Sequence, residues 1–270
     1  MQHFIIDGIR GYRSRFDHIQ LIQEVLEELP AHLGVEPAMP AFLLPYYNGV
    51  VPEDCGVSAF VLLRGGHFTL HTFSFREAYF ADFVAPAAFD TSTLRQHLDA
   101  AFPCASISTH TVSRTPGALR TVTPSVTEDF GPHVFLDIAE YQGPTTMDDL
   151  FSLFDSLPWE IDMTPIMRPY TLKGTTTAGQ RFVSVVTMIA ESHIILHVFP
   201  DQRTAYLDLF SCRFFDTDKV LTQIKAELPG QVVNEALIGR GSKYHLLRTE
   251  REDEVAKSKG WLDAVTTREQ

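Results

Sequence analysis

Ser192, His197 and Cys212 are the residues in the second half of the chain whose types could do chemistry. Ser192 follows Glu191 within the apolar segment 189–197, and Cys212 closes the next apolar segment. Both segments are rich in aliphatic and β-branched residues, which favour strands, whereas strands disfavour Glu and gain little from Ser. We therefore predict that 189–197 is one strand and that its Glu-Ser pair is either a reactive site or a core position.

An internal repeat indicates where the partners of these residues lie. Residues 57–114 align without a gap on residues 183–240, 126 positions later. The aligned identities include Ser58 with Ser184, His67 with His193, His71 with His197, Asp82 with Asp208, and Arg114 with Arg240. This many identities indicate a duplicated unit, with repeats at 1–126 and 127–270. A tandem pair of this kind predicts an intramolecular pseudo-dimer.

Each repeat has the pattern of a strand, a helix, further strands and a second helix. In the first repeat, 3–7 is a strand, and Asp17 precedes a helix with apolar residues at helical spacing that ends at Pro30. Paired strands at 57–63 and 68–73 follow, joined by a glycine turn. The second repeat has the same order. A charged tail and a short amphipathic segment come last, and we expect them to pack on the outside.

The composition is typical of a globular protein. The 270 residues are 44% hydrophobic and 21% charged, and the formal net charge is −12. This charge argues against a nucleic-acid or anionic-membrane surface. The three cysteines form neither a disulfide framework nor a metal-binding spacing. No signal peptide or membrane-spanning segment is expected, because no apolar stretch approaches about 20 residues. A cytoplasmic protein is therefore the expectation.

The two repeats differ where the chemistry would lie. Ser192 and Cys212 have Gly66 and Pro86 as their counterparts in the first repeat. In contrast, Ser58 and His71 of the first repeat are kept in the second repeat as Ser184 and His197.

Two-fold packing of the repeats would complete one site and leave the other inactive. Ser192 and Cys212 would meet Ser58 and His71 of the first repeat. The mirror site would hold Ser184 and His197 of the second repeat. It would have Gly66 and Pro86 of the first repeat where the other site has Ser192 and Cys212.

These residues resemble the S-adenosylmethionine decarboxylase family. The segments 183–184, 189–193, 197–201 and 210–212 have the spacing of its small bacterial form, and the tandem layout is similar to its eukaryotic form. The resemblance extends over nearly the whole chain. It implies an α+β fold, an internally duplicated αββα sandwich in which two antiparallel sheets, each covered by helices, are related by a pseudo-two-fold axis.

The resemblance also implies a cofactor that the chain makes from itself. Ser192 attacks the carbonyl of Glu191, the chain splits, and Ser192 becomes an N-terminal pyruvoyl group. This group would form a Schiff base with a substrate amine and accept electrons during decarboxylation. His71 is then the base, with Ser58 as its hydrogen-bond partner. Cys212 would return a proton, which suits a thiol of ordinary pKa about 8.5.

A metal site is the alternative use of the histidines. His67 and His71, like His193 and His197, have the spacing of zinc ligands on a helix. Their segments have the composition of strands, however, and four residues along a strand separate two side chains by about 13 Å. We therefore predict no metal.

The sequence departs from the family at the substrate-binding positions. The family's ribose-binding carboxylate corresponds to Phe75, and one adenine-stacking aromatic is absent, whereas the other corresponds to Phe135. Lost hydrogen bonds to a ribose would cost about 1–3 kcal/mol. We therefore expect a basic amino acid, L-ornithine or L-arginine, with S-adenosylmethionine as the alternative. Glu53 and Asp54 would face the cationic tail, or simply form an exposed acidic turn.

A second class of function stays open. A family member that is not processed could instead bind and regulate an active decarboxylase. The retained Glu191, Ser192 and Cys212 favour the enzyme, because a regulator does not need them. For the enzyme we expect a small-molecule substrate of polyamine biosynthesis and no nucleic-acid or membrane partner, and a homodimer is one option for its assembly.

Overall fold

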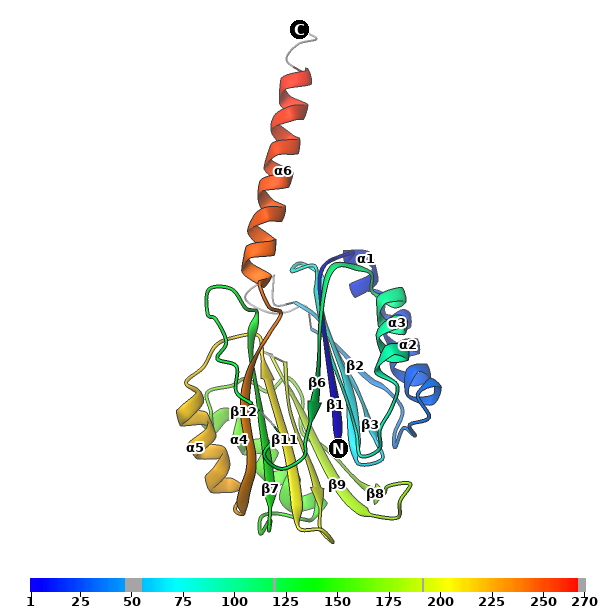
Figure 1. The fold of residues 1–270 in the computed structure, drawn as a ribbon, viewed down its shortest axis with the longest axis vertical. Coiled ribbons are helices and arrows are strands. Elements are labelled where there is room, and N and C mark those ends of the chain that lie inside the picture. The colour runs from blue at the N-terminus through cyan, green and yellow to red at the C-terminus, as the bar shows by residue number, and fades with distance from the viewer. Residues whose placement is uncertain (47–54, 119, 191, 267–270) are drawn as a thin grey trace.

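Two six-stranded antiparallel sheets, one from each repeat, form the centre of the protein (Figure 1). The computed structural model describes residues 1–46, 55–118, 120–190 and 192–266, with only the backbone described for 46 and 258–266. The first sheet has the order β2-β3-β4-β5-β1-β6. Its strands are β1 Gln2–Gly11, β2 Phe42–Tyr46, β3 Gly56–Leu63, β4 Gly66–Phe73, β5 Ala78–Ala85 and β6 Cys104–Ser113.

The second sheet has the corresponding order β12-β7-β11-β10-β9-β8. Its strands are β7 Gly131–Ala139, β8 Tyr170–Thr175, β9 Arg181–Ile189, β10 Ser192–Phe199, β11 Thr204–Ser211 and β12 Gln231–Arg240. All pairings in both sheets are antiparallel.

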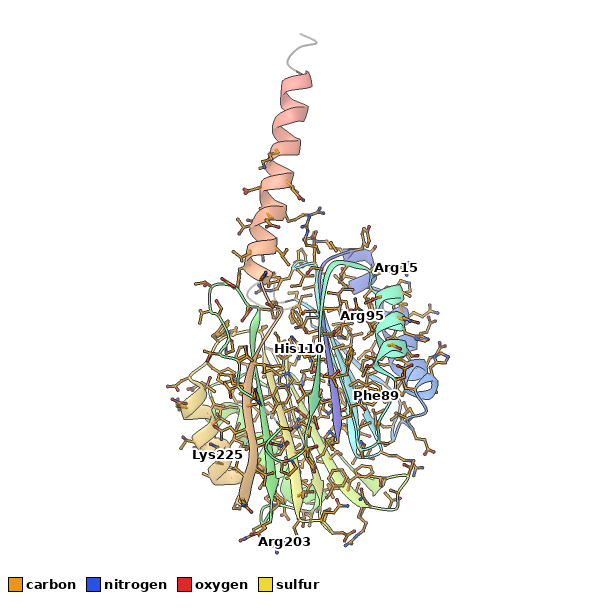
Figure 2. The ribbon with its side chains drawn as sticks, in the orientation of Figure 1. Arg15, Phe89, Arg95, His110, Arg203 and Lys225 are labelled. Atoms are coloured by element: carbon orange, nitrogen blue, oxygen red, sulfur yellow. The ribbon has the colours of Figure 1, made fainter. Side chains whose placement is uncertain are left out.

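Helices cover the outer face of each sheet, which gives the expected duplicated αββα sandwich. The helices are α1 Arg13–Phe16, α2 Ile19–His32 and α3 Thr91–Ala101 on the first sheet, α4 Met147–Glu160 and α5 Thr217–Glu227 on the second, and α6 Tyr244–Thr266. Charged side chains on the covering helices, such as Arg95 of α3 and Lys225 of α5, lie on the outside (Figure 2). Within the described residues, no helix has both the length and the apolar composition for a membrane crossing.

Alternation along the strands gives each sheet an apolar outer face and a partly polar inner face. In β4, Phe68 and Leu70 join the apolar core under the helices, whereas His67 and His71 contact histidines of the other repeat. This is the reason that so many fully buried polar residues lie between the sheets.

Three expectations from the sequence were wrong in detail. The segment 189–197 is a hairpin rather than one strand: β9 ends at Ile189 and β10 begins at Ser192. Pro30 lies inside α2, since a proline near the end of a helix removes only one donor.

The C-terminal tail is the third correction. It forms one 23-residue helix, α6, which begins at Tyr244 rather than following a charged linker. In Figure 1, α6 extends away from the two sheets instead of packing along them.

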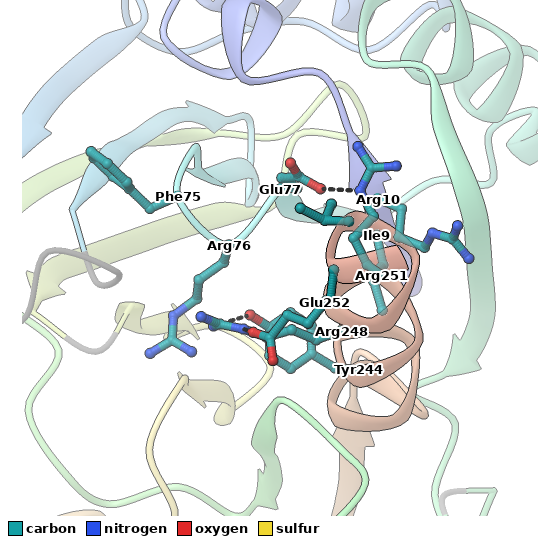
Figure 3. A pocket seen from close by; sticks show the side chains of 11 residues that line it. Ile9, Arg10, Phe75, Arg76, Glu77, Tyr244, Arg248, Arg251 and Glu252 are labelled. Carbon is teal, nitrogen blue, oxygen red and sulfur yellow. Dashed lines mark hydrogen bonds and ion pairs between the residues drawn. The ribbon is translucent and has the colours of Figure 1, made fainter. Parts of the chain in front are cut away.

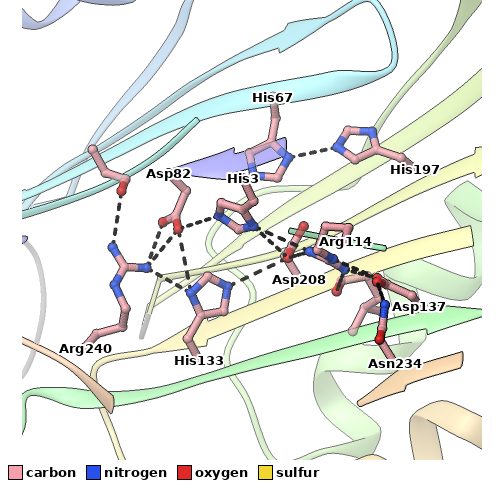
Figure 4. Close-up of polar contacts among 12 residues, drawn as sticks. His3, His67, Asp82, Arg114, His133, Asp137, His197, Asp208, Asn234 and Arg240 are labelled. Atoms are coloured by element: carbon pink, nitrogen blue, oxygen red, sulfur yellow. Dashed lines mark hydrogen bonds and ion pairs between the residues drawn. The ribbon is translucent and has the colours of Figure 1, made fainter. Parts of the chain in front are cut away.

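Two buried arginines cross between the repeats (Figure 4). Arg114, just after β6, donates to Asp137 and Asp208 of the second repeat, at 2.7 and 2.5 Å. Arg240, at the end of β12, donates to Asp7 and Asp82 of the first repeat, at 2.8 and 2.9 Å. Both guanidinium groups are fully buried, so each repeat neutralises carboxylates of the other.

Two histidines lie between these ion pairs. His3 contacts Asp82 at 3.0 Å, and His133 contacts Arg240 at 2.9 Å. Burial alone would raise the pKa of Asp82, but Arg240 and the two histidines outweigh it and hold that pKa well below its usual range. The carboxylate is therefore ionised in the folded protein.

Removing one arginine should destabilise the protein strongly. Arg114→Met would leave Asp137 and Asp208 buried without their cation, so we expect a loss of about 3–5 kcal/mol in the free energy of unfolding. Chemical denaturation would measure it. The control is Arg181→Met, which breaks an exposed ion pair with Asp201 and should change the free energy of unfolding far less. Equal losses in the two variants would contradict the role assigned to Arg114.

Candidate functional site

A chain of hydrogen bonds runs from the first repeat to the residue after Ser192. Ser58 Oγ contacts His71 Nδ1 at 2.9 Å, and His71 Nε2 contacts His193 Nδ1 at 2.7 Å. The two imidazole rings are stacked, with an interplanar angle of 9°. His193 directly follows Ser192 in β10, so the predicted base of one repeat contacts the residue next to the predicted processing site of the other.

The same chain exists on the mirror side. Ser184 Oγ contacts His197 Nδ1 at 2.7 Å, and His197 Nε2 contacts His67 Nδ1 at 2.8 Å. Both chains end on an imidazole, of His193 or His67, whose Nε2 is buried without a hydrogen-bond partner among the described residues. The two repeats have thus kept equivalent hydrogen-bonded chains of one serine and two histidines on both sides.

All four imidazoles are neutral near pH 7. Burial lowers the pKa of His193 to about 4 and that of His197 to about 3. Burial, with a neighbouring histidine as the next cause, holds the pKa values of His67 and His71 well below the usual 6.5. Neutral imidazoles can accept a proton, as a general base must.

Ser192 has an unusual environment for a strand residue. It is 1% exposed, and its hydroxyl has no hydrogen-bond partner among the described residues. Its φ of 155° lies in a region that favours glycine. Such backbone strain costs about 1–3 kcal/mol and is concentrated at functional sites. Breaking the bond before Ser192 would remove this φ constraint altogether. Glu191 lies outside the described residues.

Cys212, the residue after β11, is buried in an aromatic cluster shared by both repeats. The cluster contains Ile9, Phe73, Ala78 and Phe80 of the first repeat and Phe130, Phe210, Cys212 and Tyr244 of the second. Phe80 is the cross-strand partner of His71, and the ring of Phe210 lies 6.1 Å from the His71 ring. Cys212 is therefore packed among residues that adjoin His71.

The mirror positions have no room for the missing side chains. A Cβ at Gly66, the counterpart of Ser192, would lie 2.0 Å from the carbonyl oxygen of Val84. Gly65, the counterpart of Glu191, has a φ of 86°, and a Cβ there would lie about 3.1 Å from Phe199 and Pro86. The first repeat is thus built around glycine at this turn and cannot regain the Glu-Ser pair without moving backbone.

Phe75 lies on the wall of a cavity of about 360 Å³ next to the aromatic cluster (Figure 3). Its ring is 45% exposed and has the guanidinium of Arg13 at 4.7 Å from its centroid. The rest of the wall carries four arginines and two glutamates together with the start of α6: Arg10, Arg76, Arg248, Arg251, Glu77 and Glu252. Two of the pairs, Arg251 with Glu77 and Arg248 with Glu252, are ion pairs.

Another predicted substrate residue, Phe135, lies away from this cavity. Phe135 is fully buried between the sheets, packed on Ile5 and Ala236 and stacked on His133 at 4.2 Å. In this conformation it presents no surface to a substrate. Glu53 and Asp54 lie outside the described residues.

Sequence reasoning missed His193 and His67 as members of the hydrogen-bonded chains. It considered them only as metal ligands and rejected them. The available signal was the alternation of histidine with apolar residues in 67–71 and 193–197, which points both histidines of each strand to one buried face.

Comparisons with known proteins agree with the layout of the two repeats. A family model described as S-adenosylmethionine decarboxylase matches residues 2–115 and 135–241. A curated relative, the S-adenosylmethionine decarboxylase proenzyme of Symbiobacterium thermophilum, is 31% identical over 77 residues. That alignment covers 26% of this chain and 58% of the relative, so the match spans somewhat more than half of the relative's length.

A solved structure is also similar. The crystal structure of the adenosylmethionine decarboxylase from Aquifex aeolicus VF5 has 20% sequence identity and a TM-score of 0.36. The match covers 42% of this chain and 92% of that one.

The buried histidines predict a pH-dependent stability. Because their pKa values in the folded protein are lowered, the unfolded chain takes up protons below about pH 6.5 while the folded protein does not. Stability should be full above pH 6.5 and fall as the pH is lowered, by about 1.4 kcal/mol per pH unit for each such histidine. Denaturant titrations between pH 7.5 and 5 would measure this slope.

Two variants identify the source of that slope. His197→Asn should reduce it by about one histidine's share, whereas His97→Asn, on the exposed face of α3, should leave it unchanged. A stability that is flat across this range would show that the four imidazoles are not kept neutral by the fold.

Proposed function

The chain belongs to the S-adenosylmethionine decarboxylase family, and on that premise we propose that it is a self-processing, pyruvoyl-dependent amino-acid decarboxylase. One observation carries the proposal. The 2.7 Å contact between His71 and His193 brings a neutral imidazole of the first repeat to the residue after Ser192.

In the processing step, the hydroxyl of Ser192 attacks the carbonyl carbon of Glu191, and the amide becomes an ester. Removal of the Ser192 α-proton then expels the Glu191 carboxylate and splits the chain, which leaves a dehydroalanine at position 192. Its enamine tautomerises to an imine, and water hydrolyses the imine, releasing ammonia and leaving the pyruvoyl carbonyl. A buried hydroxyl without a partner and a strained φ support Ser192 as the attacking residue. The mirror site cannot follow the same course, because the counterpart of Ser192 is Gly66.

His71 is proposed as the base and Ser58 as the residue that positions it. The 2.9 Å contact between Ser58 Oγ and His71 Nδ1 would fix the orientation of the imidazole ring, and the lowered pKa of His71 keeps it able to accept a proton. His193 extends the chain of hydrogen bonds and offers a second place for that proton.

The pyruvoyl group proposed at Ser192 would supply an electrophilic carbonyl that accepts the electron pair left by carbon dioxide. Ser192 pairs across β10 and β11 with Ser211, the residue before Cys212, and the buried cluster around Cys212 adjoins His71. Cys212 is proposed to deliver the proton that replaces the lost carboxylate on the substrate.

For the substrate we propose a basic amino acid, L-ornithine or L-arginine. Phe75 supports this choice, because it puts an exposed aromatic ring in the place of a ribose-binding carboxylate, under the guanidinium of Arg13. Glu77 and Glu252 lie on the same wall and are the carboxylates among the described residues that line this cavity. A cationic tail would bind them in competition with Arg251 and Arg248.

S-adenosylmethionine is the second candidate. It is favoured by the relative from Symbiobacterium thermophilum, whose name states that activity.

Replacing Ser192 should prevent processing. We expect the wild-type protein to give two fragments on a denaturing gel, residues 1–191 and 192–270, with a blocked second fragment by mass spectrometry. Ser192→Ala should stay intact, because it lacks the attacking hydroxyl. His71→Asn should slow the split by about 10²–10⁴-fold, as loss of a general base does.

The repeat provides matched controls. Ser184→Ala and His197→Asn change the same positions on the mirror side and should process normally. Cys212→Ser should process but lose carbon dioxide release. An intact wild-type chain without activity would instead support a regulatory paralogue.

The substrate proposal is tested by restoring a carboxylate. Carbon dioxide release should be measured in parallel from L-ornithine, L-arginine and S-adenosylmethionine. Phe75→Glu should raise kcat/KM for S-adenosylmethionine about 10–100-fold, as expected for about 1–3 kcal/mol from restored hydrogen bonds. Asp201→Ala, at the mirror position of Phe75, should change nothing. Efficient wild-type turnover of S-adenosylmethionine would show that a carboxylate at position 75 is not required.

A further inference from the structure

Helix α6 provides one wall of the cavity of about 360 Å³ beside Phe75 (Figure 3). The remaining described lining comes from β1 and from the turn between β4 and β5. The lining residues that belong to α6 are Tyr244, Arg248, Arg251, Glu252, Val255 and Ala256. Without α6 the cavity would be an open groove on the first repeat, so the position of α6 decides how a ligand enters.

The start of α6 is anchored in the protein core. Tyr244 is fully buried in the aromatic cluster, and Leu247 packs against that cluster. The far end of α6 extends away from both sheets (Figure 1). The middle of the helix, which covers the cavity, therefore depends on other contacts for its position.

Two ion pairs with partly exposed side chains hold the middle of α6 on the first repeat. Arg251 lies 3.7 Å from Glu77, in the turn after β4, and Glu254 lies 3.1 Å from Arg10 of β1. Exposed pairs of this kind contribute little to stability, because water and salt screen them. The middle of α6 can therefore leave the cavity without disturbing the core that anchors Tyr244.

The charges of the lining oppose a basic substrate while α6 is in place. The described lining carries four arginines and two glutamates. Each glutamate is paired with an arginine of α6, Glu77 with Arg251 and Glu252 with Arg248. The guanidinium of Arg251 is also the group that ends the side chain of L-arginine. It therefore contacts Glu77 in the way that the basic end of such a substrate would.

We propose that α6 is an autoinhibitory lid, in which Arg251 occupies Glu77 in place of the basic group of the substrate. The pair of Glu254 with Arg10 keeps the lid closed. Substrate binding displaces Arg251 and lifts the middle of α6, while Tyr244 stays anchored. This inference deepens the proposed function and rests on its basic amino-acid substrate.

The lid belongs to one side of the molecule. The second repeat continues from Arg240 into α6, whereas the described part of 115–130, which follows Arg114 in the first repeat, contains no helix. The cavity covered by α6 adjoins the aromatic cluster around Cys212. The helix was thus added on the side where the processing site lies.

Calorimetric titration of the uncleaved Ser192→Ala variant with L-arginine measures binding without turnover. In that background, Arg251→Met should tighten binding by about 2- to 6-fold, because an exposed ion pair is formed only a few times more often than it is open. In the processed protein, Arg251→Met should lower KM for L-arginine by the same factor rather than raise kcat.

Glu254→Gln separates a lid from a simple effect of charge. The change removes a negative charge near the cavity, which alone would weaken the binding of a cation. It also releases α6 from Arg10, so the lid predicts tighter binding, as for Arg251→Met. The control is Lys257→Met, on α6 but outside the cavity lining, which should leave binding unchanged. Circular dichroism would establish that all three variants are folded.

The lid and the proposed decarboxylase can fail separately. Weaker or unchanged binding in Glu254→Gln, or unchanged binding in Arg251→Met, would overturn the lid even if the wild-type protein decarboxylates L-arginine. Absence of L-arginine binding at millimolar concentration in both variants would overturn it as well. Tighter binding in both variants of a chain that is never cleaved would support the lid and contradict only the processing step.

Discussion

Burial of two guanidinium groups between the sheets is the constraint on which the rest of the structure depends. Arg114 and Arg240 each leave their own repeat and end among carboxylates of the other. Burying a charge without a partner is so costly that neither repeat could keep its carboxylates ionised alone. The arginines therefore fix how the sheets lie on each other, and with that the distance between histidines of opposite repeats.

The hydrogen-bonded chains are a consequence of this packing. His71 reaches His193, and His197 reaches His67, only because β4 and β10 face each other across the interface. The scaffold is thus symmetric in its ion pairs, its histidines and even its edge-to-face aromatic pairs. What is asymmetric is local: one turn, the residue after β11, and the aromatic rings added by Phe130 and Tyr244.

Much of this organisation could be predicted from the sequence, because duplication makes pairs of residues informative. The identity of Asp82 with Asp208 and of Arg114 with Arg240 helped to establish the duplication, but it did not show that these charges are buried. Their cross-repeat pairing could not be read, since alignment says which positions are equivalent and not which ones touch. The hairpin after Ile189 was missed because apolar residues lie on both sides of the connection between β9 and β10, so composition alone suggests one continuous strand. The length of α6 was missed because a helix that leaves the protein body carries no apolar stripe against a core.

The loss of Ser and Cys from one side is better understood as specialisation than as decay. A decaying site would be expected to lose its buried polar groups first, because a hydrogen-bonded serine and histidine are useful only while their partners remain. Here Ser184 and His197 are retained at 2.7 Å, and the adjacent glycine turn fits so tightly that a side chain at Gly66 would meet backbone. On the opposite side, the space next to the aromatic pair has been filled with further rings around Cys212. The two halves therefore differ at one turn and in the rings packed around Cys212, and the buried arginines keep the framework around both the same.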